Sequence, residues 1–122
     1  MKITKENIDL VKKFINYCVE KLDIKSKEIN VVLSEVAQEM PTAGHFNPNT
    51  KKINVTVKNR ALADCLRTIS HELTHFKQLE SGVDFPEDDD GLQKYEDEAN
   101  VMSGRFVRFF GRENRKIYED IG

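Results

Sequence analysis

The sequence predicts an α+β fold in which helices pack on one face of a small sheet. Three observations predict this class: an amphipathic segment at the N-terminus, short β-branched segments in the middle of the chain, and two long amphipathic segments after them. The 122 residues have the length of one domain. We therefore expect 1–122 to be a single domain, with a loosely held tail at 112–122.

The first predicted element is an amphipathic helix from Thr4 to about Leu22. Its apolar residues follow the i, i+3, i+4, i+7 spacing of a helix that buries one face. They are Ile8, Val11, Phe14, Ile15, Cys18, Val19 and Leu22. Thr4 comes just before this pattern and is suited to cap the helix N-terminus. We expect this helix to cover the sheet.

The middle of the chain predicts three strands. Residues 29–33 are short, apolar and β-branched, as expected of a buried or half-buried strand. Residues 42–46 and 52–57 flank the turn cluster 47–50, which is a hairpin pattern. The segment 52–57 alternates strictly between polar and apolar residues, so we expect an exposed, one-sided edge strand. The sheet should be mostly antiparallel.

Two long helices should follow the sheet. The first runs from about 60 to 79 with Asn59 as its N-cap. Its apolar stripe consists of Leu62, Leu66, Ile69, Leu73 and Phe76. The acidic, turn-rich stretch 83–91 predicts a loop, and the last helix should run from about 92 to 110 and end at Gly111.

Composition excludes several classes of protein. Nineteen basic and twenty-one acidic residues give a net charge of −2, which argues against a nucleic-acid-binding protein. The two cysteines, Cys18 and Cys65, lack the spacing of a disulfide framework or a zinc knuckle and fit a reducing compartment. No stretch is apolar enough to span a membrane, and the N-terminus lacks the apolar core of a secretory signal. We therefore expect a cytoplasmic protein without a membrane partner.

The strongest chemical motif is His71-Glu72-Leu73-Thr74-His75, an HExxH pattern inside the helix at 60–79. Histidines four residues apart share a helix face, so both imidazoles can bind one zinc ion. Glu72 lies at the edge of that face, where it can reach a zinc-bound water as a general base. With three His and twelve Glu, a shuffled sequence would contain this pattern in roughly 1% of cases. The competing interpretation is an ordinary helix that carries two histidines.

A catalytic zinc site needs a third protein ligand. The acidic segment 95–100 of the last predicted helix offers Glu96 or Glu98. Glu96 and Asn100 are four residues apart and share a face, so Glu96 could bind the metal while Asn100 accepts a hydrogen bond from a ligand histidine. Acidic residues near a helix start also favour the helix dipole, which is the competing explanation.

The two motifs together resemble the gluzincin metallopeptidases, in which an HExxH helix is completed by a glutamate from a following helix. The compact size is similar to that of the minigluzincins, and the Glu-Asp-Glu-Ala-Asn segment is similar to small bacterial and phage metallopeptidases. The resemblance covers about 43–110 and implies zinc ligands His71, His75 and Glu96, with Asn100 supporting a ligand histidine. It also implies that an extended peptide pairs with the strand at 52–57, through Asn54 and Thr56.

The function implied is that of a zinc-dependent metalloendopeptidase with one zinc ion per chain and a peptide or protein substrate. Larger gluzincins carry a C-terminal subdomain that supplies a group to stabilise the tetrahedral intermediate. The candidates for that group here are His45, Tyr95, Arg105 and Tyr118. The alternative function is a catalytically weak or latent regulatory module with a structural zinc.

Three further features carry weaker signals. His45 could be a fourth ligand, although its place at a strand and turn favours a position on the rim of a site. The run 88–91 contains three aspartates but lacks the spaced ligands of a calcium loop, which favours a solvated loop. The basic residues of 105–116 favour a solvated face over a nucleic-acid patch.

Overall fold

The structure, a computed structural model, describes residues 1–35 and 43–119 and has the predicted α+β fold. Its elements are α1 (Lys5–Leu22), β1 (Asn30–Ser34), β2 (Gly44–Asn47), β3 (Lys52–Thr56), α2 (Leu62–Glu80), α3 (Asp89–Glu113) and a 3-10 helix (Arg115–Tyr118). This is the order expected from the sequence. The start of the predicted strand at Thr42 and the end of the predicted tail, 120–122, lie outside the described residues.

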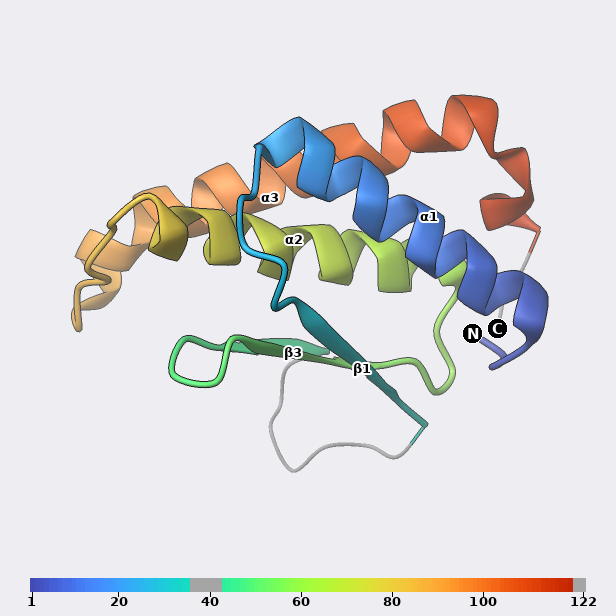
Figure 1. Cartoon of the computed structure of the whole chain (residues 1–122), viewed down its shortest axis with the longest axis horizontal. Helices are drawn as coiled ribbons and strands as arrows, with labels where there is room; N and C mark the ends of the chain where they lie inside the picture. Colours follow the sequence, from blue (N-terminus) through green and yellow to red (C-terminus); the bar gives the residue numbers. More distant parts are fainter. Residues whose placement is uncertain (36–42, 120–122) are drawn as a thin grey trace.

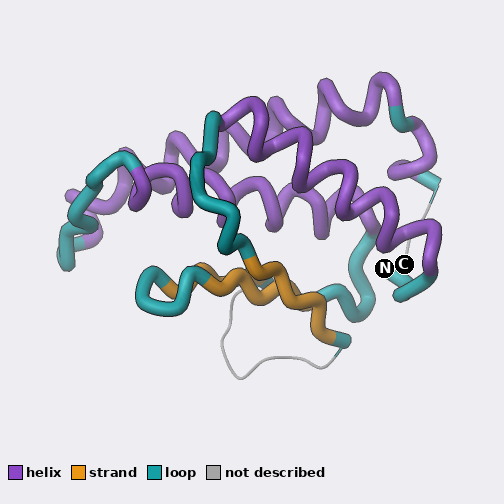
Figure 2. The backbone as a smooth tube through the Cα atoms, viewed as in Figure 1, coloured by secondary structure: helices purple, strands orange, loops and turns teal. Residues whose placement is uncertain are grey.

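The molecule has two layers (Figures 1 and 2). The three α-helices lie on one side of the sheet, and α2 contacts both the sheet and the other two helices. Because α2 contacts α1, α3, β2 and β3, the helix that carries the HExxH motif is the centre of the fold. Within the described part of the chain, no helix combines the length and the apolar character needed to cross a membrane.

The N-terminal helix begins as predicted. The Thr4 side chain accepts a hydrogen bond from the Asn7 N–H at 3.2 Å, which satisfies one of the free donors at the helix start. The helix ends at Leu22, because the next residue, Asp23, has a left-handed φ of 55° that prevents a further helical turn. Its buried face includes Val11, Phe14 and Cys18, so α1 covers the core through the stripe that the sequence predicted.

The sheet is mixed, which differs from the mostly antiparallel sheet that we expected. The strand order is β1-β3-β2, with β1 parallel and β2 antiparallel to β3. The strand at 52–56 is therefore the central strand and not the exposed edge. The prediction that Asn54 and Thr56 pair with a peptide substrate is wrong, because both edges of β3 are already hydrogen-bonded to neighbouring strands. In the part of the chain that the structure describes, β2 is an edge strand with no strand on its outer side.

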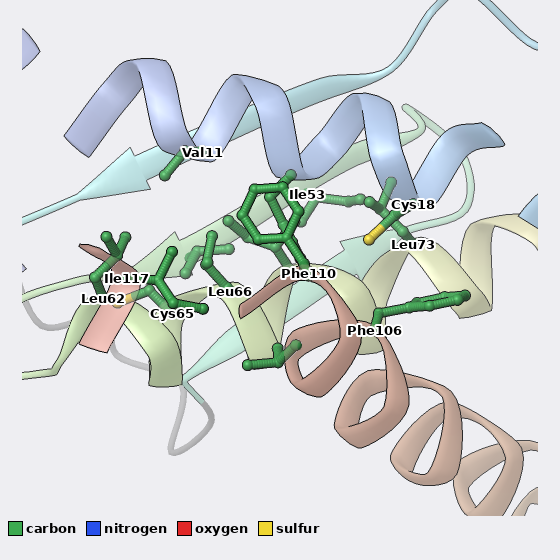
Figure 3. Packing of buried hydrophobic residues seen from close by; sticks show 14 of the residues in the cluster. Val11, Cys18, Ile53, Leu62, Cys65, Leu66, Leu73, Phe106, Phe110 and Ile117 are labelled. Carbon is green, nitrogen blue, oxygen red and sulfur yellow. The ribbon is translucent and has the colours of Figure 1, made fainter. Parts of the chain in front are cut away.

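One hydrophobic core joins the helices to the sheet (Figure 3). Ile53 and Val55 of β3 are fully buried, and they share the core with Leu66 and Leu73 of α2. Aromatic rings of α1 and α3 complete it, with Phe14 and Phe110 in edge-to-face contact at 5.1 Å. The apolar stripe of α2 thus faces the core, and this orientation directs the opposite face of α2 outward.

The start of α2 differs from the prediction. Asn59 does not cap the helix, because it has a left-handed φ of 58° and belongs to the preceding turn. The N-cap is Ala61, which makes no side-chain capping hydrogen bond. Asparagine is favoured both at helix caps and in left-handed turns, and the sequence pattern did not distinguish these two uses.

The last helix is longer than predicted at both ends. It begins at Asp89 because Asp88 caps it, with the Asp88 carboxylate accepting the Gly91 N–H at 2.8 Å. Asp89 and Asp90 lie in the first turn, where negative charge is favoured by the helix dipole. These positions at the helix start explain the run of aspartates without invoking a calcium site. Gly111 does not end the helix, which continues to Glu113.

The C-terminal segment is packed as far as Tyr118, in contrast to the loose tail that we expected. Residues 115–118 form a 3-10 helix, and the Ile117 side chain is fully buried in the core. The Tyr118 ring lies where a side chain on Gly111 would be, so a glycine in α3 makes room for it. These contacts hold the segment against α3.

Gly44 allows β2 to lie close to α2, and we expect Gly44→Ala to destabilise the protein by about 1–3 kcal/mol through overpacking. A Cβ at Gly44 would collide with the Thr68 methyl group of α2. Chemical denaturation of the purified variant measures this effect. Gly104 in α3 is the matched control: a Cβ there meets nothing within 4 Å, so Gly104→Ala should stabilise by about 0.5–1 kcal/mol.

The double variant Gly44→Ala/Thr68→Ser tests the cause. Serine removes the colliding methyl but keeps the hydroxyl that accepts a hydrogen bond from Arg60 Nη2 at 2.6 Å. The double variant should recover most of the lost stability. A Gly44→Ala loss that Thr68→Ser does not relieve would contradict this origin.

Candidate metal centre

The face of α2 that points away from the core carries both motif histidines. His71 and His75 are one helical turn apart, and their ring centroids are separated by 4.8 Å. Their Nε2 atoms approach to 3.2 Å. The same turn directs Leu73, which is fully buried, into the core on the other side. The i, i+4 spacing therefore produces the paired imidazoles that the sequence predicted.

Helix α3 packs along α2 and brings Glu96 to these rings. Glu96 Oε1 lies 2.9 Å from His75 Nε2, and Glu96 Oε2 lies 3.2 Å from His71 Nε2. Glu98 is two positions further along the helix, is exposed, and accepts a hydrogen bond from Gln78 instead. Of the two glutamates that the residues alone left open, the structure places Glu96 beside the histidines.

The three side chains fit a metal ion. Their ligand atoms all lie within 4.8 Å of one another, so His71, His75 and Glu96 could hold one. Around a tetrahedral zinc ion with bond lengths near 2.0–2.1 Å, neighbouring ligand atoms are about 3.3–3.4 Å apart. The observed separations of 3.2, 3.2 and 2.9 Å are close to that spacing. Two imidazoles and one carboxylate are also a donor set that zinc accepts.

His71 is held in a form suited to metal binding. Burial, followed by the neighbouring His75, lowers the pKa of His71, while Glu96 and a hydrogen bond to the Asn100 side chain oppose this shift. A neutral imidazole is the form that binds metals. Asn100 thus hydrogen-bonds to His71, which agrees with the predicted spacing of Glu96 and Asn100.

Glu72 lies beside the histidines but outside the cluster of possible ligands. Its side chain is buried, and burial raises its pKa to about 7, with His75 opposing the shift. Its carboxylate accepts a hydrogen bond from the Phe46 backbone N–H of β2. Glu72 therefore lies between α2 and the edge strand, and a carboxyl group with a pKa near neutrality is suited to accept and return a proton.

A cavity of about 570 Å³ opens over this group of residues. Its lining includes Gly44 and Phe46 of β2, Tyr95 and Glu96 of α3, and Phe85 of the loop before α3. His71, Glu72 and His75 of α2 also line it. A volume of this size is typical of a site for a small molecule or a few residues of a peptide.

The structure separates the four candidates for stabilising a tetrahedral intermediate. Tyr95 and His45 line the cavity. Arg105 lines a different groove, beside Phe109, and Tyr118 packs on Gly111. These positions contradict the assignment of such a role to Arg105 or Tyr118.

His45 does not join the metal cluster. A Cβ on Gly44 would point at α2, so strand alternation directs the next side chain, His45, to the opposite face of the sheet. His45 is exposed. It is a residue of the cavity rim, as the sequence position favoured, and not a fourth ligand.

Two residues near the site were missed in the sequence. Arg67, one turn before His71, is exposed and lies on the cavity lining. Gln78 is buried, and its Oε1 lies 2.8 Å from His75 Nδ1. The i, i+3 spacing from His75 to Gln78 was visible in the sequence, but a glutamine on a helix is too common for that spacing to indicate a role.

Comparisons with known proteins do not assign the chain to a family. No protein-family model matches it, and neither curated proteins nor solved structures gave a significant match. The site geometry therefore carries the functional argument by itself.

Proposed function

We propose that this chain is a zinc-dependent metallopeptidase, similar in its site to the gluzincins, that hydrolyses peptide bonds. The observation that carries the proposal is the convergence of His71, His75 and Glu96 on one point, with the buried Glu72 beside them in the same cavity. A purely structural metal site has no need of a buried carboxylate in the same cavity as its ligands.

The proposed chemistry divides the work between a metal and one side chain. Zinc held by His71, His75 and Glu96 would supply a Lewis acid that activates water and polarises a carbonyl group. Glu72 accepts a proton from the attacking water as the new C–O bond forms. It then delivers that proton to the leaving amine as the C–N bond breaks. Tyr95, on the cavity wall, is within the region where the substrate would lie.

The proposed substrate is an extended peptide that pairs with the outer edge of β2. The sequence predicted that the peptide pairs with the strand at 52–57, but that strand is the central strand β3, so we assign this role to β2. Gly44 and Phe46 of β2 line the cavity, and the hydrogen bond from the Phe46 N–H to Glu72 places this strand beside the general base. Addition of a strand to a sheet edge gives affinity through main-chain hydrogen bonds.

We also propose that the protein acts in the cytoplasm. Cys18 and Cys65 are both buried cysteines. Burial raises the pKa of the Cys18 thiol well above its usual value, which keeps it protonated and unreactive. Buried thiols of this kind are compatible with a reducing compartment.

Metal content and peptide cleavage test the proposal together. The purified protein should bind about one zinc ion per chain, as measured by mass spectrometry of the metal and by competition with a chromogenic chelator. Zinc-loaded protein should cleave members of a diverse peptide library, and the cleavage should stop after chelation and return with added zinc. His71→Ala should remove most of the zinc and the cleavage, since two protein ligands remain.

The outcomes distinguish the two functions that the sequence left open. Zinc binding without cleavage of any library peptide would favour the regulatory module with a structural zinc. Folded protein that binds no divalent metal would exclude both.

A further inference from the structure

Gln78 makes three hydrogen bonds, which engage both the nitrogen and the oxygen of its side-chain amide. Its side chain is 5% exposed and lies between α2 and α3. The Nε2 group donates to the Tyr95 carbonyl at 3.1 Å and to Glu98 Oε1 at 3.0 Å. The Oε1 atom faces His75 Nδ1 at 2.8 Å.

These contacts determine which end of the amide faces His75. The Tyr95 carbonyl oxygen and the ionised Glu98 carboxylate can only accept hydrogen bonds. The NH2 group of Gln78 must therefore point towards them. The amide oxygen is then left for His75. An oxygen atom accepts, so His75 Nδ1 must carry the proton.

The consequence reaches the candidate metal site. In a neutral imidazole with a proton on Nδ1, the lone pair is on Nε2. His75 Nε2 lies 2.9 Å from Glu96 Oε1 and 3.2 Å from His71 Nε2. Without a metal ion, the ionised Glu96 carboxylate competes for a proton on Nε2, and a metal ion bound between them removes this competition. The Nδ1–H tautomer is the reverse of the one that a free histidine side chain prefers in water, so the protein must impose it.

We propose that Gln78 is a positioning residue for the metal site: it fixes His75 as the Nδ1–H tautomer and thereby presents the Nε2 lone pair to the metal. Through Tyr95 and Glu98, the same amide connects this ligand to α3, the helix that carries Glu96. Gln78 thus positions a ligand of α2 and the helix of the third ligand together. The inference rests on the metal site of the proposed function but does not require hydrolysis.

The first experiment is the tautomer of His75 in the metal-free full-length protein. NMR of protein with ¹⁵N-labelled histidine, at alkaline pH where the rings are neutral, separates protonated from unprotonated ring nitrogens. Because the Glu96 carboxylate competes for a proton on Nε2, the comparison is made in Glu96→Ala protein. There His75 should be protonated at Nδ1, and adding Gln78→Leu should shift the population towards Nε2–H. Since no metal is present, this result stands apart from the success or failure of the proposed function.

The second experiment is zinc affinity, measured by chelator competition. Gln78→Leu should weaken zinc binding by about 10–100-fold, the usual effect of removing a partner of a metal ligand. The double variant Gln78→Glu/Glu98→Gln keeps an acceptor for His75 and exchanges the amide and the carboxylate, but it places a carboxylate oxygen where Gln78 Nε2 donates to the Tyr95 carbonyl. It should therefore restore the Nδ1–H tautomer and only part of the affinity. Glu98→Ala is the matched control: the Tyr95 carbonyl still holds the Gln78 amide, so the tautomer should be unchanged.

Three results would overturn the proposal. The first is His75 protonated at Nε2 in metal-free Glu96→Ala protein, where no carboxylate faces that nitrogen. The second is a Gln78→Leu change that alters neither the tautomer in that background nor the zinc affinity of the wild type. The third is a loss of zinc affinity without any change of tautomer, because that would show Gln78 to act only by holding α2 and α3 together.

Discussion

Glu96→Ala is expected to weaken zinc binding by orders of magnitude, while Glu98→Ala leaves the affinity within a few-fold of wild type. The Glu96 carboxylate reaches both histidines, at 2.9 and 3.2 Å, so its removal leaves a site with two protein ligands. Glu98 contacts Gln78 instead and is not one of the possible ligands. Chelator competition with zinc measures both affinities. The two variants are matched, because each replaces one glutamate of α3 with alanine and so changes charge and helix propensity equally.

Protein stability provides the internal check. Neither glutamate lies in the hydrophobic core, so both variants should unfold near the wild-type denaturant midpoint in the absence of metal. Added zinc should raise the midpoint of the wild type and of Glu98→Ala, because an ion that binds the folded state stabilises it. It should not raise that of Glu96→Ala. The reverse ranking of the two variants would show that α3 is rotated relative to α2 when metal binds.

The metal cluster could be predicted from the sequence because it depends on helical periodicity. The spacing of His71 and His75 places them on one face, and the apolar stripe that includes Leu73 determines which face is buried. The choice of Glu96 over Glu98 needed either the family resemblance or the structure. Residues two positions apart on a helix point in directions about 200° apart, so only the packing of α3 on α2 decides which glutamate faces the histidines.

The position of the edge strand could not be predicted in the same way. The alternation of Ile53 and Val55 with polar residues shows that one face of β3 is buried, and this is what the structure has. Alternation reports the two faces of a strand, whereas central or edge position depends on which backbones pair. The parallel pairing of β1 with β3 is a long-range contact with no local sequence signal. Gln78 was missed for the same reason, since its partners Tyr95 and Glu98 belong to another helix.

Glu72→Gln is expected to reduce peptide hydrolysis by about 100- to 10,000-fold without loss of zinc. The amide has the size of the carboxylate and can still accept the hydrogen bond from the Phe46 N–H, but it cannot take a proton from water. Glu72 is outside the cluster of possible ligands, so His71, His75 and Glu96 remain in place. The variant should fold at least as well as wild type, because it removes an ionisable group from a buried position.

A matched control on the same helix makes this result specific. Glu80→Gln is the same chemical change two turns further along α2, where the carboxylate accepts the backbone N–H groups of Lys25 and Ser26, outside the cavity lining. It should leave zinc content and the rate of hydrolysis at wild-type values, with any effect confined to stability. Cleavage rates and zinc stoichiometry are measured on the same preparations of the three proteins. Wild-type hydrolysis by zinc-loaded Glu72→Gln would mean that Glu72 is not the general base and that any peptidase activity of the chain arises from another group.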